Sequence, residues 1–101
     1  MLASGRDNAL LRFSLGNEYL SRKEPREAVI HLRQAIKLDG NYSAAWKLLG
    51  KALTETGNTV AAIDCYREGI KTSEANGDRQ AAKEMMVFLK RLERKAAIGG
   101  G

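Results

Sequence analysis

Residues 43–66, SAAWKLLGKALTETGNTVAAIDCY, decide the fold, because their pattern occurs a second time in the chain. The apolar residues of this stretch recur three and four positions apart, which is the spacing of one helix face. Gly57 and Asn58 interrupt that spacing with residue types that favour a turn. The stretch therefore predicts two helices joined by a short connection.

The pattern recurs upstream after a shift of 34 residues. Leu15–Gly16 then coincides with Leu49–Gly50, and further pairs coincide as well: Tyr19 with Leu53, Ala28 with Ala62, and Leu32 with Tyr66. Small residues let two helix backbones approach, and large ones fill the holes beside them. One such hairpin cannot bury its apolar face alone, so we expect neighbouring hairpins to stack.

Helical spacing extends over most of the chain. It predicts five helices, at about residues 7–22, 25–38, 42–56, 59–75 and 78–96. Pro25 suits the first turn of the second helix, and Asp78 suits the N-cap of the last. No segment shows the period-two alternation of a strand, so the predicted class is all-α.

The doubled pattern resembles the tetratricopeptide repeat, a helix–turn–helix unit of 34 residues, over about residues 9–76. This resemblance implies a right-handed α-α superhelix of two helical hairpins and a capping helix. The expected organisation is one domain, 1–101, with repeat 1 at about 9–42, repeat 2 at about 43–76, the cap at about 78–96 and a flexible tail at 97–101. The first unit departs from the family at Arg12, Lys23 and Gly40, where Trp, Gly and Pro are usual.

The last helix is out of step with the 34-residue period. Adding 34 to Trp46, Leu49 and Leu53 leads to Gln80, Lys83 and Val87, a poor core set, whereas adding 36 leads to Ala82, Met85 and Leu89. We therefore expect two extra residues before this helix.

The chain has 101 residues, a formal net charge of +5 and one cysteine. It has no apolar run near the ~20 residues of a membrane span, and its start lacks the apolar core of a secretion signal, so the expected location is cytoplasmic and no membrane contact is expected. His31 and Cys65 lie 34 residues apart with no third ligand, so we predict no metal site and no cofactor, and we expect Cys65 to be a partly buried, small apolar filler. No catalytic motif is present, so an enzyme is not expected.

In tetratricopeptide-like arrays the first helices of the hairpins form a concave groove. Mapped onto this chain, the resemblance implies that peptide-binding residues are Phe13, Asn17, Lys47, Lys51, Lys83, Lys90 and Arg91, flanked by Leu10, Leu20, Thr54, Glu55 and Val87. Phe13 is the predicted apolar anchor, and the cations complement acidic groups of a peptide. The alternative is that the cations only solvate an exposed face and that Phe13 packs beneath the N-terminal segment.

The leading functional hypothesis is a protein-interaction adaptor or scaffold. The carboxylate clamp of chaperone-tail-binding family members is not expected, because only Asn17 matches it, and Phe13, Leu48, Gln80 and Glu84 stand at its other positions. One alternative is self-association through the apolar first helix. Nucleic-acid binding through Lys90–Arg91 and Arg94–Lys95 is less favoured, because Phe88 is the only ring nearby.

Overall fold

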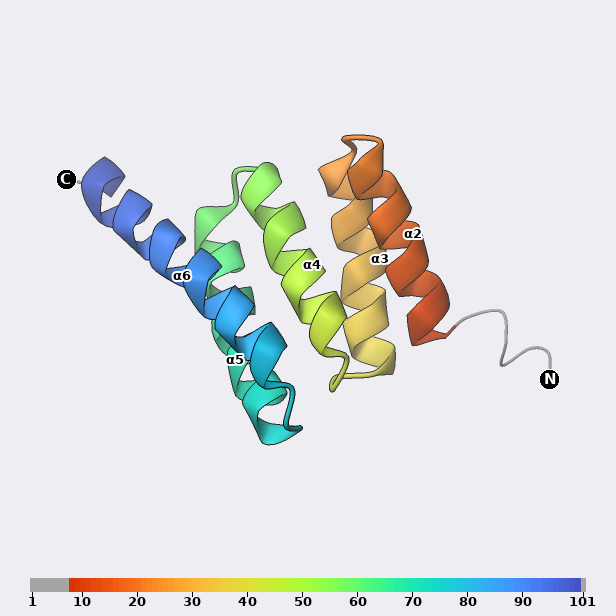
Figure 1. The fold of residues 1–101 in the computed structure, drawn as a ribbon. Coiled ribbons are helices and arrows are strands. Elements are labelled where there is room, and N and C mark those ends of the chain that lie inside the picture. Colours follow the sequence, from red (N-terminus) through yellow and green to blue (C-terminus); the bar gives the residue numbers. More distant parts are fainter. Residues whose placement is uncertain (1–7, 101) are drawn as a thin grey trace.

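The structure, a computed structural model, describes the backbone of residues 8–100 and the side chains of residues 8–98. Within these residues the chain forms five α-helices and no strand, in the order α2 (Ala9–Ser21), α3 (Pro25–Leu38), α4 (Ser43–Glu55), α5 (Thr59–Ala75) and α6 (Arg79–Gly100) (Figure 1). The all-α prediction is confirmed.

Polar side chains set the start of three helices. The Oδ1 atoms of Asn8, Asn58 and Asp78 each accept a hydrogen bond from the backbone N–H three residues later, at 2.8, 3.3 and 3.1 Å. Each bond satisfies one of the free donors of a helix N-terminus. The structure thus confirms the predicted N-cap Asp78, and it also places Pro25 in the first turn of α3.

Left-handed residues end the first helix of each hairpin. Gly57, which follows α4, has φ +83°, and Lys23, 34 residues earlier, has φ +61°. A left-handed conformation costs a non-glycine residue roughly 1–2 kcal/mol. The departure at Lys23 therefore lowers stability but leaves the path of the chain unchanged.

The helices of each hairpin touch at a glycine. A Cβ atom at Gly16 of α2 would lie 2.5 Å from Leu32 Cγ of α3, and a Cβ atom at Gly50 of α4 would overlap the Tyr66 ring of α5. Leu32 and Tyr66 are both buried. Positions 16 and 50 therefore require glycine, because a large side chain of the partner helix lies against each of them.

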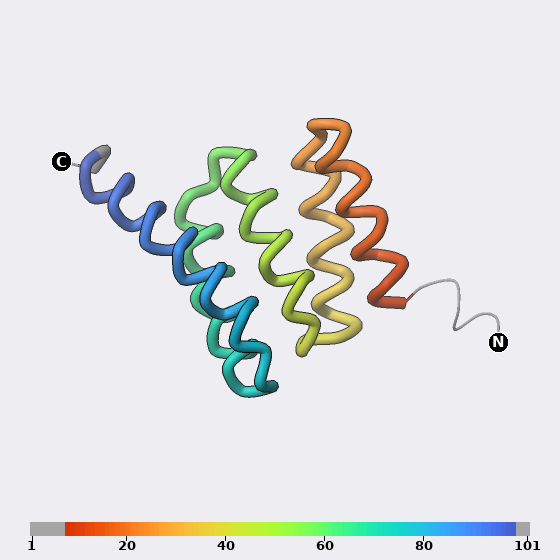
Figure 2. Tube along the Cα trace, viewed as in Figure 1, coloured from red at the N-terminus to blue at the C-terminus, as the bar shows by residue number. Residues whose placement is uncertain are grey.

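Helices α2, α4 and α6 follow one another across one side of the molecule, and α3 and α5 lie behind them (Figure 1). The molecule measures 53 × 31 × 18 Å, and α2 and the end of α6 lie at opposite ends of its long axis (Figure 2). Within residues 8–100, no further helix covers the side of α2, α4 and α6 that faces away from α3 and α5.

Helix α6 follows the shifted register. Ala82 and Met85 are buried and Leu89 is half-buried, as the 36-residue offset predicts. Met85 packs against Gly69 of α5, where a Cβ atom would lie 2.6 Å from its sulfur. The helix continues to Gly100, beyond the predicted end near residue 96, and its second half projects past α5 (Figure 1).

The contact between Gly50 and Tyr66 can be tested with Gly50→Ala. Overpacking costs about 1–3 kcal/mol, which outweighs the helix-propensity gain of about 1 kcal/mol. We expect a net loss of up to about 2 kcal/mol in urea unfolding followed by Trp46 fluorescence. Gly40→Ala is the control, because its Cβ would meet only Ile36 O at 3.8 Å. An unchanged or higher stability of Gly50→Ala would contradict the close approach.

Candidate functional site

The candidate site is the side of the molecule formed by α2, α4 and α6, here called the front face, which Figure 1 shows toward the viewer. It corresponds to the groove expected from the sequence. Of the residues predicted on α2, Asn17 is exposed and Phe13 is half-buried. The Phe13 ring lies against Tyr42 at the start of α4, with ring centroids 5.0 Å apart. The Phe13 side chain, the predicted apolar anchor, therefore already makes an aromatic contact within the protein.

An ion pair connects α4 to α6 in the middle of the front face. Lys47 Nζ donates a hydrogen bond to Glu84 Oε1 at 2.6 Å. This hydrogen bond, with a second one from Gln80 and the Lys47 charge, lowers the pKa of the Glu84 carboxyl. The predicted cation at Lys47 is thus neutralised by Glu84, which the sequence analysis put at a clamp position but not among the peptide-binding residues.

A pocket of about 330 Å³ opens between α4 and α6. It is called the Tyr66 pocket here and is lined by Lys51, Thr54, Glu55, Tyr66, Phe88, Arg91 and Leu92. Tyr66 is only 2% exposed, and its ring centroid lies 5.8 Å from that of Phe88. Burial raises the pKa of Tyr66 to about 12, against a hydrogen bond with Thr54 that lowers it, so the phenol stays neutral at physiological pH. Two predicted residues, Lys51 and Arg91, meet at this pocket.

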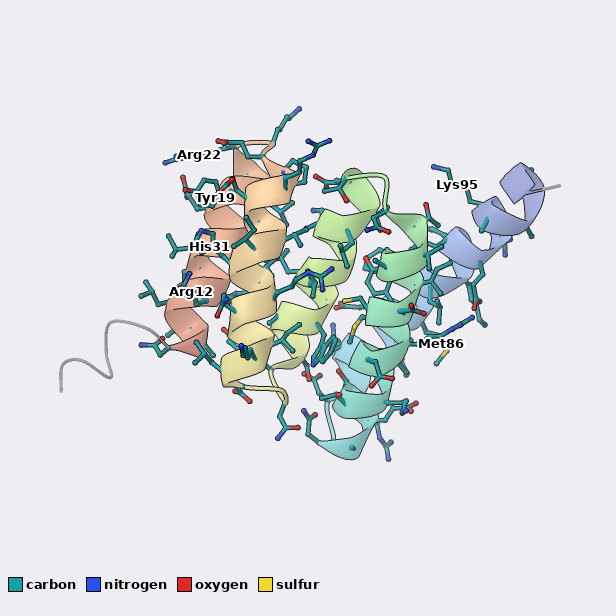
Figure 3. The ribbon with its side chains drawn as sticks, turned by 180° about the vertical axis from the view of Figure 1, so that it is seen from behind. Arg12, Tyr19, Arg22, His31, Met86 and Lys95 are labelled. Carbon is teal, nitrogen blue, oxygen red and sulfur yellow. The ribbon has the colours of Figure 1, made fainter. Side chains whose placement is uncertain are left out.

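The structure does not bring Lys83 to the same place. Lys83 lines a different hollow, with Glu74, Arg79, Ala82 and Met86. Figure 3, the view from behind, shows Met86 on the side of the molecule opposite to Figure 1. Lys90 is exposed on α6 and is not among the residues of the Tyr66 pocket. Lys83 and Lys90 therefore do not join Lys51 at the Tyr66 pocket, and their part in peptide binding stays a prediction.

The rotation of α6 about its axis explains why Lys83 and Lys90 do not line the Tyr66 pocket. Each residue turns the helix by about 100°. Ala81, Met85 and Leu92 are buried, which directs this stripe of α6 toward the core. The residues beside the stripe on the α4 side are then Glu84, Phe88 and Arg91, whereas Lys83 and Lys90 fall on the side away from it. A helical wheel centred on Met85 could have identified Glu84 and Phe88 from the sequence.

His31 and Cys65 have separate structural roles. Arg12 Nη1 donates to His31 Nδ1 at 3.1 Å, and the His31 ring stacks on Tyr19 with centroids 5.3 Å apart; these side chains lie along α2 and α3 (Figure 3). Cys65 is buried as a free thiol, as predicted, and its Sγ donates to the Trp46 carbonyl at 3.4 Å. Burial raises the pKa of Cys65 to about 12.

The described residues contain neither a cluster of metal ligands nor a membrane-spanning helix. No group of three or more His, Cys, Asp or Glu side chains within them could hold a metal ion. None of the described helices is both long and apolar enough to cross a membrane.

Comparison with known proteins identifies the family. The model of the tetratricopeptide repeat matches residues 9–42 and 43–76, so the chain belongs to the tetratricopeptide repeat family. Tetratricopeptide repeat domains generally mediate protein–protein interactions, and the family is typically non-enzymatic.

Three relatives show how far the similarity extends. A TPR repeat-containing protein of Pseudomonas aeruginosa is 48% identical over 94 residues, which is 93% of this chain and 90% of the relative. A protein of Bordetella parapertussis with a solution structure is 44% identical with a TM-score of 0.83, covering 97% of this chain and 85% of that one. A tetratricopeptide repeat domain protein of Salinibacter ruber shares the fold at 24% identity and a TM-score of 0.78, over 84% of this chain and 86% of its own.

The ion pair between Lys47 and Glu84 predicts a pH-dependent effect of Glu84→Gln. Because the Glu84 pKa is lower in the folded chain than the ordinary ~4.3, the pair stabilises the fold fully above that pH and less as the pH falls through the lowered pKa. We expect a small decrease in Tm at pH 7 that becomes smaller as the pH falls through the lowered pKa of Glu84. Glu55→Gln, which removes a carboxylate without an ion pair among the described residues, is the control. A decrease in Tm that persists at low pH would show that loss of the Lys47–Glu84 ion pair is not its cause.

The burial of Cys65 predicts slow reaction of its thiol. A pKa of about 12 leaves little thiolate at pH 8. We expect an aromatic disulfide reagent to modify the folded chain roughly a hundredfold or more slowly than the chain in guanidinium chloride. Similar rates in the two conditions would show that the thiol is accessible and activated.

Proposed function

We propose that this protein is an interaction adaptor that binds a segment of a partner protein on its front face. The segment carries acidic groups that lie over the junction of α4 and α6. The family supports the general role, and the arrangement of side chains at this junction supports the acidic preference.

One observation carries the proposal. Lys51 and Arg91 line the same pocket from two different helices, and both are exposed. Within residues 8–98 neither forms an ion pair, whereas Lys47, one turn before Lys51, is paired with Glu84. Cations left unpaired beside an apolar hollow provide charge complementarity and an apolar contact together.

The adaptor role requires no chemistry from the protein. The rigid stack of hairpins presents a surface along α2, α4 and α6, and binding of a partner segment needs only that surface. We place this role in the cytoplasm, and the single cysteine, buried as a free thiol, supports a reducing compartment.

Self-association is a second candidate, because α2 exposes two large apolar side chains. Leu10 is 64% exposed and Leu11 is 38% exposed, on the first helix that the structure describes. Exposed apolar side chains that lie together can form an interface between two copies. Sedimentation velocity at two concentrations tests this candidate, and a constant monomer mass would exclude it.

A pair of double charge reversals tests the main proposal. Lys51→Glu with Arg91→Glu, and Lys83→Glu with Lys90→Glu, each lower the formal net charge from +5 to +1. If the partner binds at the junction of α4 and α6, the first pair weakens binding by at least ~tenfold, while the second pair has little effect. Binding is measured by capture of the same native partner from an extract of the source organism, with quantification by mass spectrometry.

Two outcomes would contradict the proposal. An equal loss with both pairs would show that the binding depends on net charge and not on position. Undiminished capture with Lys51→Glu and Arg91→Glu would show that the partner binds elsewhere on the molecule. Far-UV circular dichroism of each variant confirms that the helices are retained.

A further inference from the structure

The interior of the Tyr66 pocket is suited to an apolar group. Tyr66, Phe88 and Leu92 supply carbon surface, and the Tyr66 hydroxyl is hydrogen-bonded with Thr54. The polar lining residues Lys51, Glu55 and Arg91 are exposed at the surface. An apolar group that is buried against the three carbon-rich side chains gains by leaving water.

The size of the pocket limits what enters it. A volume of about 330 Å³ lies at the lower end of the range for ligand sites, roughly 300–1,000 Å³. This volume has room for one large apolar side chain. The pocket thus suits a single anchor residue of a longer ligand.

The charges around the pocket are unevenly placed. On the α4 side, Lys51 is accompanied by Glu55 one turn later. On the α6 side, Arg91 is shared with an adjoining hollow that is also lined by Arg94, Lys95 and Ile98. The nearby carboxylate Glu93 is paired with Arg67 at 2.7 Å. A ligand carboxylate is therefore favoured on the α6 side of the pocket, between Arg91 and Lys95.

The projecting half of α6 continues this surface beyond the pocket. Lys95 lies one turn after Arg91 and is on the part of α6 that extends past α5 (Figure 3). An extended chain could cover both the pocket and this helix surface. A nucleic acid fits less well, because single-stranded nucleic acids stack successive bases on several exposed rings, and here Tyr66 is buried and Phe88 is only half-buried.

We propose that the Tyr66 pocket takes one large apolar side chain of a peptide, and that acidic residues next to this anchor bind Arg91 and Lys95 along α6. This inference rests on the proposed function and names the sequence class that the site recognises. It also assigns Phe88 as the residue that contacts the anchor directly.

Designed peptides test the inference on the full chain. The probe is a capped, fluorescein-labelled pentapeptide with a central Phe and two Asp on either side. Two matched peptides replace the Phe with Ser or all four Asp with Asn. We expect fluorescence anisotropy to show binding of the probe and at least ~tenfold weaker binding of both matched peptides.

Variants of the protein locate the binding. Arg91→Glu is expected to weaken the probe at least ~tenfold, and Lys90→Glu, the same charge change on the neighbouring residue, less than ~twofold. Phe88→Ala is expected to reduce the advantage of the Phe peptide over the Ser peptide. Because Phe88 also packs on Tyr66, amide NMR spectra of this variant check that the fold is kept, and amide shifts of the unaltered chain must cluster on residues of the Tyr66 pocket.

The outcomes separate this inference from the proposed function. Equal binding of the Phe and Ser peptides, or amide shifts confined to α2, would overturn the pocket assignment and leave an acidic segment on the front face standing. If no peptide binds but capture of the native partner still depends on Lys51 and Arg91, only the inferred class of peptide, an apolar anchor with acidic neighbours, is overturned. If capture of the native partner also does not depend on Lys51 and Arg91, the proposed function is overturned as well.

Discussion

The close approach of paired helices at glycine is the constraint on which the rest of this structure depends. Leu32 lies against Gly16, Tyr66 against Gly50, and Met85 against Gly69. Each contact fills the space that a Cβ atom would need, so the helices can neither separate without opening a cavity nor come closer without a clash. The repeated contact fixes how the two helices of each hairpin, and α5 and α6, lie against one another.

The same contacts create the candidate site. Because Tyr66 is held against Gly50, its ring forms the inner wall of the pocket between α4 and α6. Because Met85 is held against Gly69, α6 is rotated so that Phe88 and Arg91 turn toward α4. The pocket is therefore a consequence of core packing, and its shape is as rigid as the core that supports it.

Electrostatics then restrict where an acidic partner is favoured. The net charge of +5 suggests a uniformly basic surface, yet Lys47 and Arg67 are each paired with a glutamate of α6. Exposed pairs of this kind contribute little to stability, but they neutralise local charge at short range. Among residues 8–98, the lining cations of the pocket, Lys51 and Arg91, form no ion pair. Two further cations, Arg94 and Lys95, follow Arg91 on the projecting half of α6.

The sequence by itself determined the helices, the repeat and the family. The 34-residue recurrence and the 36-residue offset of the cap depend on local helical spacing and on the need for small residues at crossings, and both can be inferred from the chain. Only the tertiary structure decided the charges and walls of the site. The pairing of Lys47 with Glu84 and the meeting of Phe88 with Tyr66 join residues 37 and 22 positions apart, and they depend on the rotation of α6 about its axis. The register predicted the buried stripe of α6 but not which neighbours of that stripe face α4, so Phe88 and Glu84 were not among the predicted peptide-binding residues.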